Sequence, residues 1–199
     1  NIWIATSNGI NCIDYKTKKI TRFYPKSINK ECTTNIINRL LKHSDGNVYA
    51  FCNRSVFKCS MNQTVETVFP DIAIPSPTYS VAQAPDKDIY IGTESNGLYI
   101  YSENWKLKKH VPIDGIIATI LPDNNGDIWL GLDETGICLF NKNKQTFTWL
   151  HKDNTNLNNN SIRTFVPYGD SSILVGTFRG LNIPVSYTHL RAHETPEHL

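Results

Sequence analysis

The sequence predicts an all-β protein: a β-propeller fragment of four-stranded antiparallel blades, three complete and two partial. Apolar runs of strand length alternate with breaks rich in Gly, Asn and Asp, which favour turns. This pattern repeats five times, and a large anchor residue marks the middle of the second run in each repeat. The anchors are Trp3, Tyr49, Tyr90, Trp129 and Leu174. By subtraction, successive anchors lie 46, 41, 39 and 45 residues apart, which is the spacing of propeller blades.

The best-defined repeat starts at residue 115. Its first apolar run covers 116–121 and stops at PDNNG, its second covers 128–132 and stops at DETG, and its third covers 137–140. These runs predict a three-stranded meander, and QTFTWL from Gln145 supplies the fourth strand. Applied to the whole chain, the pattern predicts blades at about 1–34, 35–77, 78–114, 115–159 and 160–184.

The end repeats and the second repeat depart from this pattern. The first repeat lacks its first strand, and the fifth stops after its third strand begins. In the second repeat Phe51 replaces a glycine and Arg54-Ser55 replaces an Asn-Gly type of turn, so we expect a local distortion. Apolar residues on both strand faces require neighbouring blades, and the two end blades should therefore expose apolar faces and unpaired edges.

Three glycines, Gly92, Gly131 and Gly176, follow their anchors by two residues and share one strand face. Glycine inside a strand costs stability unless close packing requires it. We therefore expect these positions to admit the adjacent blade. A phosphate-binding role is disfavoured, because no helix follows them and no Lys-Ser/Thr pair is adjacent.

Composition narrows the classes of partner. The chain has 199 residues, of which 40% are hydrophobic and 19% charged, and its net charge of +2 comes from scattered basic residues. Neither nucleic acid nor an anionic membrane is an expected partner. Because the chain begins inside a strand pattern, we interpret it as a piece of a longer protein.

Five cysteines are present: Cys12, Cys32, Cys52, Cys59 and Cys138. Their odd number excludes a closed disulfide framework, and we expect small buried hydrophobic residues in strands. Tight-hairpin register predicts Cys52 near Val56 and Cys59 near Tyr49, so these two sulfurs should not meet.

Residues 185–199, VSYTHLRAHETPEHL, have no repeat pattern. They resemble translated sequencing-adapter read-through, and we expect a non-native, disordered tail. Its histidines, His189, His193 and His198, are therefore not expected to bind a metal.

Catalytic motifs are lacking: the sequence has no G-x-S-x-G, H-E-x-x-H, Walker loop or Cys-x-x-Cys. Neither a cofactor nor a metal is expected. In propellers the loop between the second and third strands opens onto the same face as the loop that enters the next blade. The charged residues of these loops, our candidate ligand-binding set, are Arg54, Glu94, Asp133, Glu134 and Arg179. They form either a polar binding surface or a solvated one.

The repeats resemble the regulator-propeller repeat, which has an aromatic residue, a Gly-Thr pair and a final Tyr or Phe. IYIGTESNGLYIY from Ile89 and GDIWLGLDETGICLF from Gly126 carry this resemblance, with NLNNNSI as a linker. It covers nearly all of residues 1–184. It implies a periplasmic sensor region of a hybrid two-component histidine kinase that responds to oligosaccharides, joined to further blades and downstream sensor domains and dimeric in full length.

Two other classes remain open. One is a protein-interaction scaffold, although the Gly-His and Trp-Asp pairs of WD repeats are missing. The other is a propeller enzyme of the lyase or quinoprotein type, although no His, Tyr and Arg cluster recurs at one face position.

Overall fold

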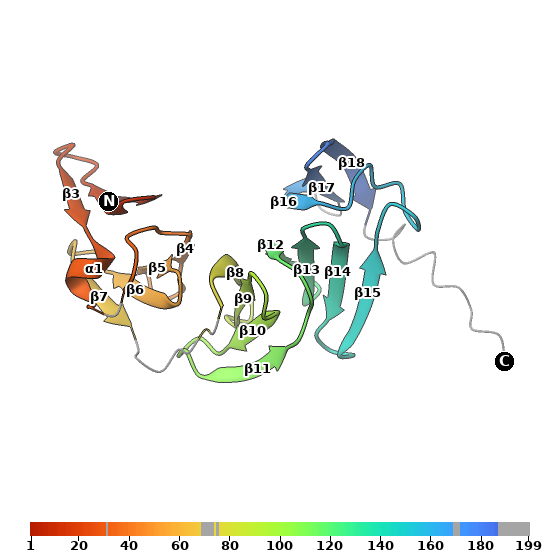
Figure 1. Ribbon diagram of the computed structural model, residues 1–199, viewed down its shortest axis with the longest axis horizontal. Helices are drawn as coiled ribbons and strands as arrows, with labels where there is room; N and C mark the ends of the chain where they lie inside the picture. Colours follow the sequence, from red (N-terminus) through yellow and green to blue (C-terminus); the bar gives the residue numbers. More distant parts are fainter. Residues whose placement is uncertain (31, 69–73, 75, 169–171, 187–199) are drawn as a thin grey trace. The chain divides into compact units, whose positions relative to one another are not determined.

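The computed structural model describes residues 1–30, 32–68, 74, 76–168 and 172–186. The chain divides into two compact units, Asn1–Ile116 and Ile117–Leu199, which are treated separately below. In both units consecutive strands pair in antiparallel fashion to form small sheets (Figure 1).

The first unit contains three sheets, which we call blades 1 to 3. Blade 1 consists of β1 (Ile2–Thr6), β2 (Gly9–Ile13) and β3 (Ile20–Phe23). Blade 2 consists of β4 (Arg39–Lys42), β5 (Val48–Cys52), β6 (Ser55–Cys59) and β7 (Val65–Val68). Blade 3 consists of β8 (Thr78–Gln83), β9 (Ile89–Thr93), β10 (Leu98–Tyr101) and β11 (Leu107–Val111).

The second unit contains blades 4 and 5. Blade 4 consists of β12 (Ile117–Pro122), β13 (Asp127–Leu132), β14 (Gly136–Asn141) and β15 (Thr146–Leu150). Blade 5 consists of β16 (Ile162–Tyr168), β17 (Ser172–Thr177) and β18 (Gly180–Ser186). The predicted fold class is confirmed: within the described residues, three blades have four strands and the two end blades have three.

The connection between blades 1 and 2 contains a single-turn helix, α1 (Pro25–Ile28), which begins with proline, a residue favoured at the first helical position. The first strand of blade 2 begins at Arg39, and the residues just before it bond to blade 1. The amide of Gly9 donates to the carbonyl of Asn35 (2.9 Å), and the amide of Ile37 donates to the carbonyl of Thr6 (3.0 Å).

The glycine after each anchor lies opposite a small hydroxyl residue of the first strand. The pairs are Gly92 with Ser80, Gly131 with Thr119 and Gly176 with Thr164. A register shift just before each pair places one extra residue in the first strand. Such a β-bulge bends the strand where the small partners leave room.

Blade 2 lacks this feature. Phe51 takes the glycine position and pairs with Arg39 in unbroken register. Its ring is fully buried in a cluster shared with Tyr49, Ile91 and Trp105. The irregularity in the sequence therefore gives a strand pair in unbroken register, where we had expected a distortion.

The cysteine register that we predicted is wrong by one residue. Cys52 pairs with Ser55 and Cys59 with Val48, because the β5–β6 turn has two residues, Asn53 and Arg54. All five thiols are free and buried.

The predicted tail overlaps the last strand, since β18 runs to Ser186. The three tail histidines lie outside the described residues. Among the residues that are described, no helix is long and apolar enough to cross a membrane.

Candidate functional site

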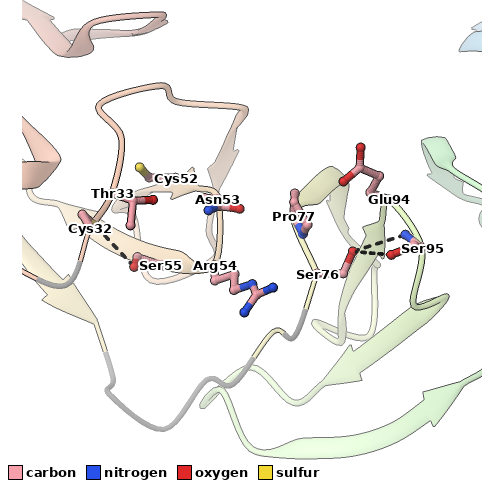
Figure 2. Close-up of a pocket in the computed structure, with 10 residues that line it drawn as sticks. All are labelled: Cys32, Thr33, Cys52, Asn53, Arg54, Ser55, Ser76, Pro77, Glu94 and Ser95. Carbon is pink, nitrogen blue, oxygen red and sulfur yellow. Dashed lines mark hydrogen bonds between the residues drawn. The ribbon is translucent and has the colours of Figure 1, made fainter.

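A pocket of about 630 Å³ lies in the first unit, between the rims of blades 2 and 3 (Figure 2). Backbone turns and connections supply most of its wall, and the residues that line it are Cys32, Thr33, Cys52, Asn53, Arg54, Ser55, Ser76, Pro77, Glu94 and Ser95. Of the five candidate binding residues, Arg54 and Glu94 are brought together here.

Arg54 is held on the blade 2 side by the tight β5–β6 turn. The turn residue Asn53 adopts a left-handed backbone conformation, with φ of 53°, which asparagine tolerates well. The carbonyl of Asn53 accepts a hydrogen bond from the amide of Thr78 at 3.2 Å, where blade 3 begins. The Arg54 side chain is thus exposed at a point where the backbone is tied to the next blade.

Glu94 is held on the blade 3 side by the turn between β9 and β10. Its amide donates to the carbonyl of Pro77 at 3.0 Å. The turn ends at Gly97 with φ of 73°, and a Cβ at this glycine would lie 2.3 Å from the carbonyl oxygen of Val111. Only glycine fits there, so the position of the Glu94 turn is set by close backbone packing.

Serine hydroxyls line the blade 3 side of the pocket. The Oγ atoms of Ser76 and Ser95 lie 3.2 Å apart, and the amide of Ser95 donates to Oγ of Ser76 at the same distance. Ser76 is buried, whereas Ser95 is exposed. The pair gives a fixed hydroxyl surface next to the turn that holds Glu94.

The pocket offers hydrogen-bonding groups and one charge of each sign. A guanidinium presents several planar donors and a carboxylate presents two acceptors, so the pocket can both donate hydrogen bonds to ligand hydroxyls and accept them. None of the described lining residues is aromatic, so the stacking platform expected for a sugar is missing from this wall. Binding here would depend on hydrogen bonds and shape.

The other three candidate residues lie in the second unit. The carboxylate of Asp133 forms an ion pair with Arg163, at 3.1 Å from Nη1. Glu134 occupies the β13–β14 turn with φ of 68°, and its amide lies 3.3 Å from Oγ of Ser161. Arg179 lies exposed in the β17–β18 turn. The structure pairs Asp133 with a protein partner that the sequence did not indicate.

Sequence reasoning missed the uncharged part of the pocket. Ser95 directly follows Glu94 in the predicted turn, so the loop rule could have included it. Ser76 and Pro77 precede the first strand of blade 3, in the kind of entry loop that was expected at the channel face. Cys32 gave no such indication, because its position depends on the path of the connection after α1.

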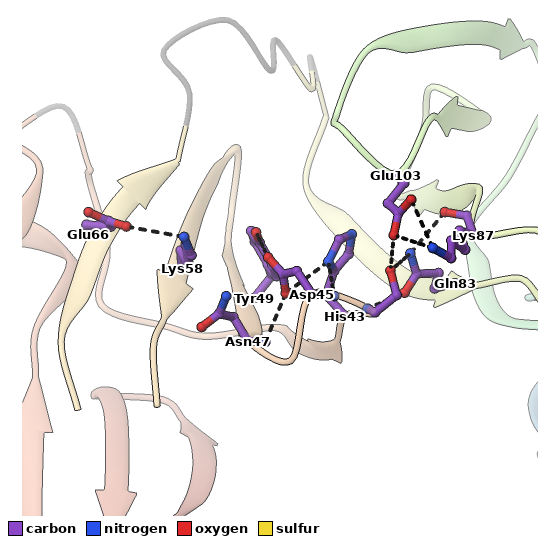
Figure 3. Close-up of polar contacts among 10 residues, drawn as sticks. His43, Asp45, Asn47, Tyr49, Lys58, Glu66, Gln83, Lys87 and Glu103 are labelled. Atoms are coloured by element: carbon purple, nitrogen blue, oxygen red, sulfur yellow. Dashed lines mark hydrogen bonds and ion pairs between the residues drawn. The ribbon is translucent and has the colours of Figure 1, made fainter. Parts of the chain in front are cut away.

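A second polar cluster surrounds Asp45 in the β4–β5 turn (Figure 3). Its carboxylate accepts hydrogen bonds from the Tyr49 hydroxyl (2.8 Å) and the Asn47 amide (2.9 Å), and Nδ1 of His43 lies 3.0 Å away. Burial opposes ionisation of Asp45, but these contacts outweigh it and lower its pKa to about 2. Burial and the bond to Asp45 raise the pKa of Tyr49 to about 12.

The Asp45 cluster continues into blade 3. The amide of Ser44 donates to Oε1 of Gln83 (2.8 Å), and the Ser44 hydroxyl donates to Glu103 (2.7 Å), which is paired with Lys87 at 3.1 Å. Both Ser44 donors thus have acceptors within the protein. This cluster therefore fastens blade 2 to blade 3 and is not a candidate binding site.

No protein-family model matches the sequence, and no curated protein matches it. Solved structures with a similar fold do exist. One is the extracellular domain assigned to a hybrid two-component system of B. thetaiotaomicron, with TM-score 0.74 and 20% identity over 92% of this chain and 25% of that one. A second such domain from the same organism has TM-score 0.71 and 24% identity, over 94% of this chain and 26% of that one.

Virginiamycin B lyase from Staphylococcus aureus is also similar, with TM-score 0.64 and 18% identity over 92% of this chain and 65% of the lyase. The fold is that of a β-propeller. The chain spans about a quarter of the length of the two extracellular domains.

Proposed function

We propose that this chain is a segment of the periplasmic, ligand-sensing propeller region of a hybrid two-component sensor, and that the pocket between blades 2 and 3 binds an oligosaccharide. The observation that carries the proposal is the convergence of Arg54 and Glu94 from adjacent blades onto one pocket lined by hydroxyl and amide groups. The similar folds of two extracellular domains from such systems support the sensor assignment.

The chemistry of the pocket favours a neutral, polyhydroxylated ligand. Hydroxyl groups can both donate and accept, so one sugar can satisfy a guanidinium, a carboxylate and serine hydroxyls together. A strongly charged ligand would be repelled by one of the two charged residues. The volume is in the range of small-ligand pockets.

Isothermal titration calorimetry of the full chain with a panel of plant and microbial oligosaccharides tests the proposal. Arg54→Ala and Glu94→Ala should each weaken binding by about 1–3 kcal/mol, because each leaves a polar group of the ligand unpaired. Arg22→Ala and Glu66→Ala are matched controls, since both residues are exposed on strands away from the pocket and should bind as the wild type does.

The same titrations test the remaining candidate residues. A loss of affinity in Arg179→Ala or Glu134→Ala, with Arg54→Ala unchanged, would move the site to the second unit and refute the pocket assignment. Release of new products from a bound oligosaccharide would favour an enzyme, the class to which the similar lyase belongs. A sensor segment should return its ligand intact.

The sensor assignment has a separate test. The complete reading frame should encode further blades and downstream sensor domains, followed by a membrane helix and a histidine kinase. The purified sensor region should be dimeric. A reading frame that continues into a scaffold or catalytic module would contradict the assignment even if the pocket binds a sugar.

A further inference from the structure

Two cysteine thiols lie side by side in the wall of the pocket, although they are far apart in the sequence. Cys32 lies in the connection after α1, and Cys52 ends β5 (Figure 2). Neither the fold nor the proposed sugar site requires a thiol at these positions.

Each thiol donates a hydrogen bond to a residue close to the other cysteine. The thiol of Cys32 donates to Oγ of Ser55 at 3.3 Å, and Ser55 is the direct cross-strand partner of Cys52. The thiol of Cys52 donates to the carbonyl of Thr34, two residues after Cys32, also at 3.3 Å. Opposite residues in an antiparallel pair have Cβ atoms about 4.5–5.5 Å apart, so the two sulfurs share one small space.

The electrostatics agree with this geometry. Burial, together with charge repulsion and a hydrogen bond from the adjacent thiol of Cys32, raises the pKa of the Cys52 thiol to about 12. Cys52 is therefore a weak nucleophile until it loses its proton. Cys32 is the more exposed of the two, at 7% against 1%, and is the thiol that a reagent entering the pocket reaches first.

We propose that Cys32 and Cys52 form a redox-active thiol pair that a small disulfide entering the pocket converts into an intramolecular disulfide. The Cys32 thiolate attacks one sulfur of the small disulfide, forms a mixed disulfide and releases one thiol. Cys52 then loses its proton and attacks Sγ of Cys32, which releases the second thiol. Two electrons pass from the protein to the small disulfide, and the two protons end on the released thiols.

Cys12 and Cys59 are a second pair of neighbouring thiols, with which the first pair can be compared. Burial, and to a smaller extent the charge of Cys12, raises the pKa of Cys59 to about 12. Both of these thiols are sealed, with exposures of 1% for Cys59 and 0% for Cys12, and neither lines the pocket. Accessibility through the pocket, and not proximity alone, therefore distinguishes Cys32 and Cys52.

Incubation of the full folded chain with 2-hydroxyethyl disulfide, a small uncharged disulfide, tests the proposal. The number of thiols that can be alkylated after denaturation should fall from five to three. Tryptic mapping should find peptides 31–39 and 43–54 joined through Cys32 and Cys52. Five remaining thiols, or a link between Cys12 and Cys59 in place of this one, would overturn the proposal.

Two variants distinguish the order of the steps. Cys52→Ser should stop at a stable mixed disulfide between Cys32 and 2-mercaptoethanol, whereas Cys138→Ser, in the second unit, should still form the link. If Cys52→Ser does not fold, the peptide map of the wild-type protein decides alone. The inference does not depend on the sugar proposal, because neither the thiol count nor the map requires a ligand.

Discussion

The imidazole of His43 stacks on the indole of Trp105, with ring centroids 5.7 Å apart and an interplanar angle of 22°. His43 lies at the β4–β5 turn of blade 2, and Trp105 lies in the β10–β11 turn of blade 3. The rings of Tyr49 and Phe51 lie 4.7 and 6.3 Å from the same indole. Trp105 of blade 3 therefore packs among the aromatic side chains of blade 2.

In the corresponding turns of the other blades, a polar residue occupies the backbone position of Trp105. Its φ of 60° is close to that of the residues before the last strand of blades 1, 2 and 4, which are Lys18, Gln63 and Gln145. Trp105→Ala should destabilise the first unit by about 3–5 kcal/mol, because a buried aromatic ring is lost. Urea unfolding followed by circular dichroism measures this. Lys18→Ala, at the same backbone position but exposed, should change stability by no more than about 0.5 kcal/mol; equal losses would show that the turn itself matters and not the ring.

Gly131 allows blade 5 to approach blade 4. A Cβ here would lie 2.5 Å from Cγ2 of Ile162 and 2.6 Å from Cγ2 of Thr119. Gly131→Ala should therefore destabilise the second unit by about 1–3 kcal/mol through overpacking. At Gly176 an added Cβ would meet one methyl group, that of Thr164, and Gly176→Ala should cost less. Thermal unfolding compares the two; a smaller loss at Gly131 would contradict the close-packing explanation.

Lys87 occupies the first-turn position at which blades 2 and 4 have glycine. Its φ is 72°, and Gly46 and Gly126 have φ of 86° and 84° at the same turn position. Lys87→Gly should be more stable than Lys87→Ala by about 1 kcal/mol, because both variants lose the exposed ion pair with Glu103 and only glycine relieves the left-handed strain. Calorimetric melting temperatures test this order. If alanine is equally stable, the backbone at this turn is not strained.

The repeat made the fold predictable from sequence, because anchor spacing and turn residues occur in every blade. Local details that depend on contacts between one blade and the next were harder to predict from the sequence. Residues 35–37 fall within the second predicted blade, 35–77, yet their backbone groups bond to Thr6 and Gly9 of blade 1. A polar-to-aromatic change at Trp105 is visible in the sequence, but the core that it fills is formed by the neighbouring blade.

The pocket shows the same division between residues that the repeat pattern indicates and contacts that depend on the path of the chain. The loop rule named Arg54 and Glu94, and adjacent blades do place them on one pocket. The thiol pair could not be inferred, because Cys32 reaches Ser55 only through the particular path of its connection. Charge alone also failed to indicate that Asp133 is already paired, since Arg163 lies on the next blade.

Asp45 should make stability depend on pH in the acid range. Its folded pKa of about 2 is below the ordinary value of 3.8, so its contribution is present above pH 3.8 and is lost as the pH falls through about 2. The side chain is 35% exposed, and after allowance for solvent screening we expect about 1–2 kcal/mol. Urea unfolding of the wild type and Asp45→Asn should differ by this amount near neutral pH and converge near pH 2. A constant difference across this range would exclude Asp45 as the source.

The two end blades should make the isolated chain self-associate. Blade 1 exposes Ile2, Ile4 and Ile20, each by at least 37%, and register places Ile2 and Ile20 opposite the same residue of β2, Ile13. On blade 5, Val166 and Leu181 are 48% and 54% exposed. Apolar surface next to an unpaired strand edge favours association.

Size-exclusion chromatography with light scattering measures this association. The full chain should elute as oligomers whose mass increases with concentration. The double variant Ile2→Lys/Ile20→Lys should have a lower mass, because a charge on the blade 1 face cannot be buried against a second copy without a large desolvation cost. Tyr15→Lys is the matched control: Tyr15 is 67% exposed but lies in a turn, so its substitution should leave the mass unchanged. A monomer at every concentration would mean that these faces are stable in water as they stand.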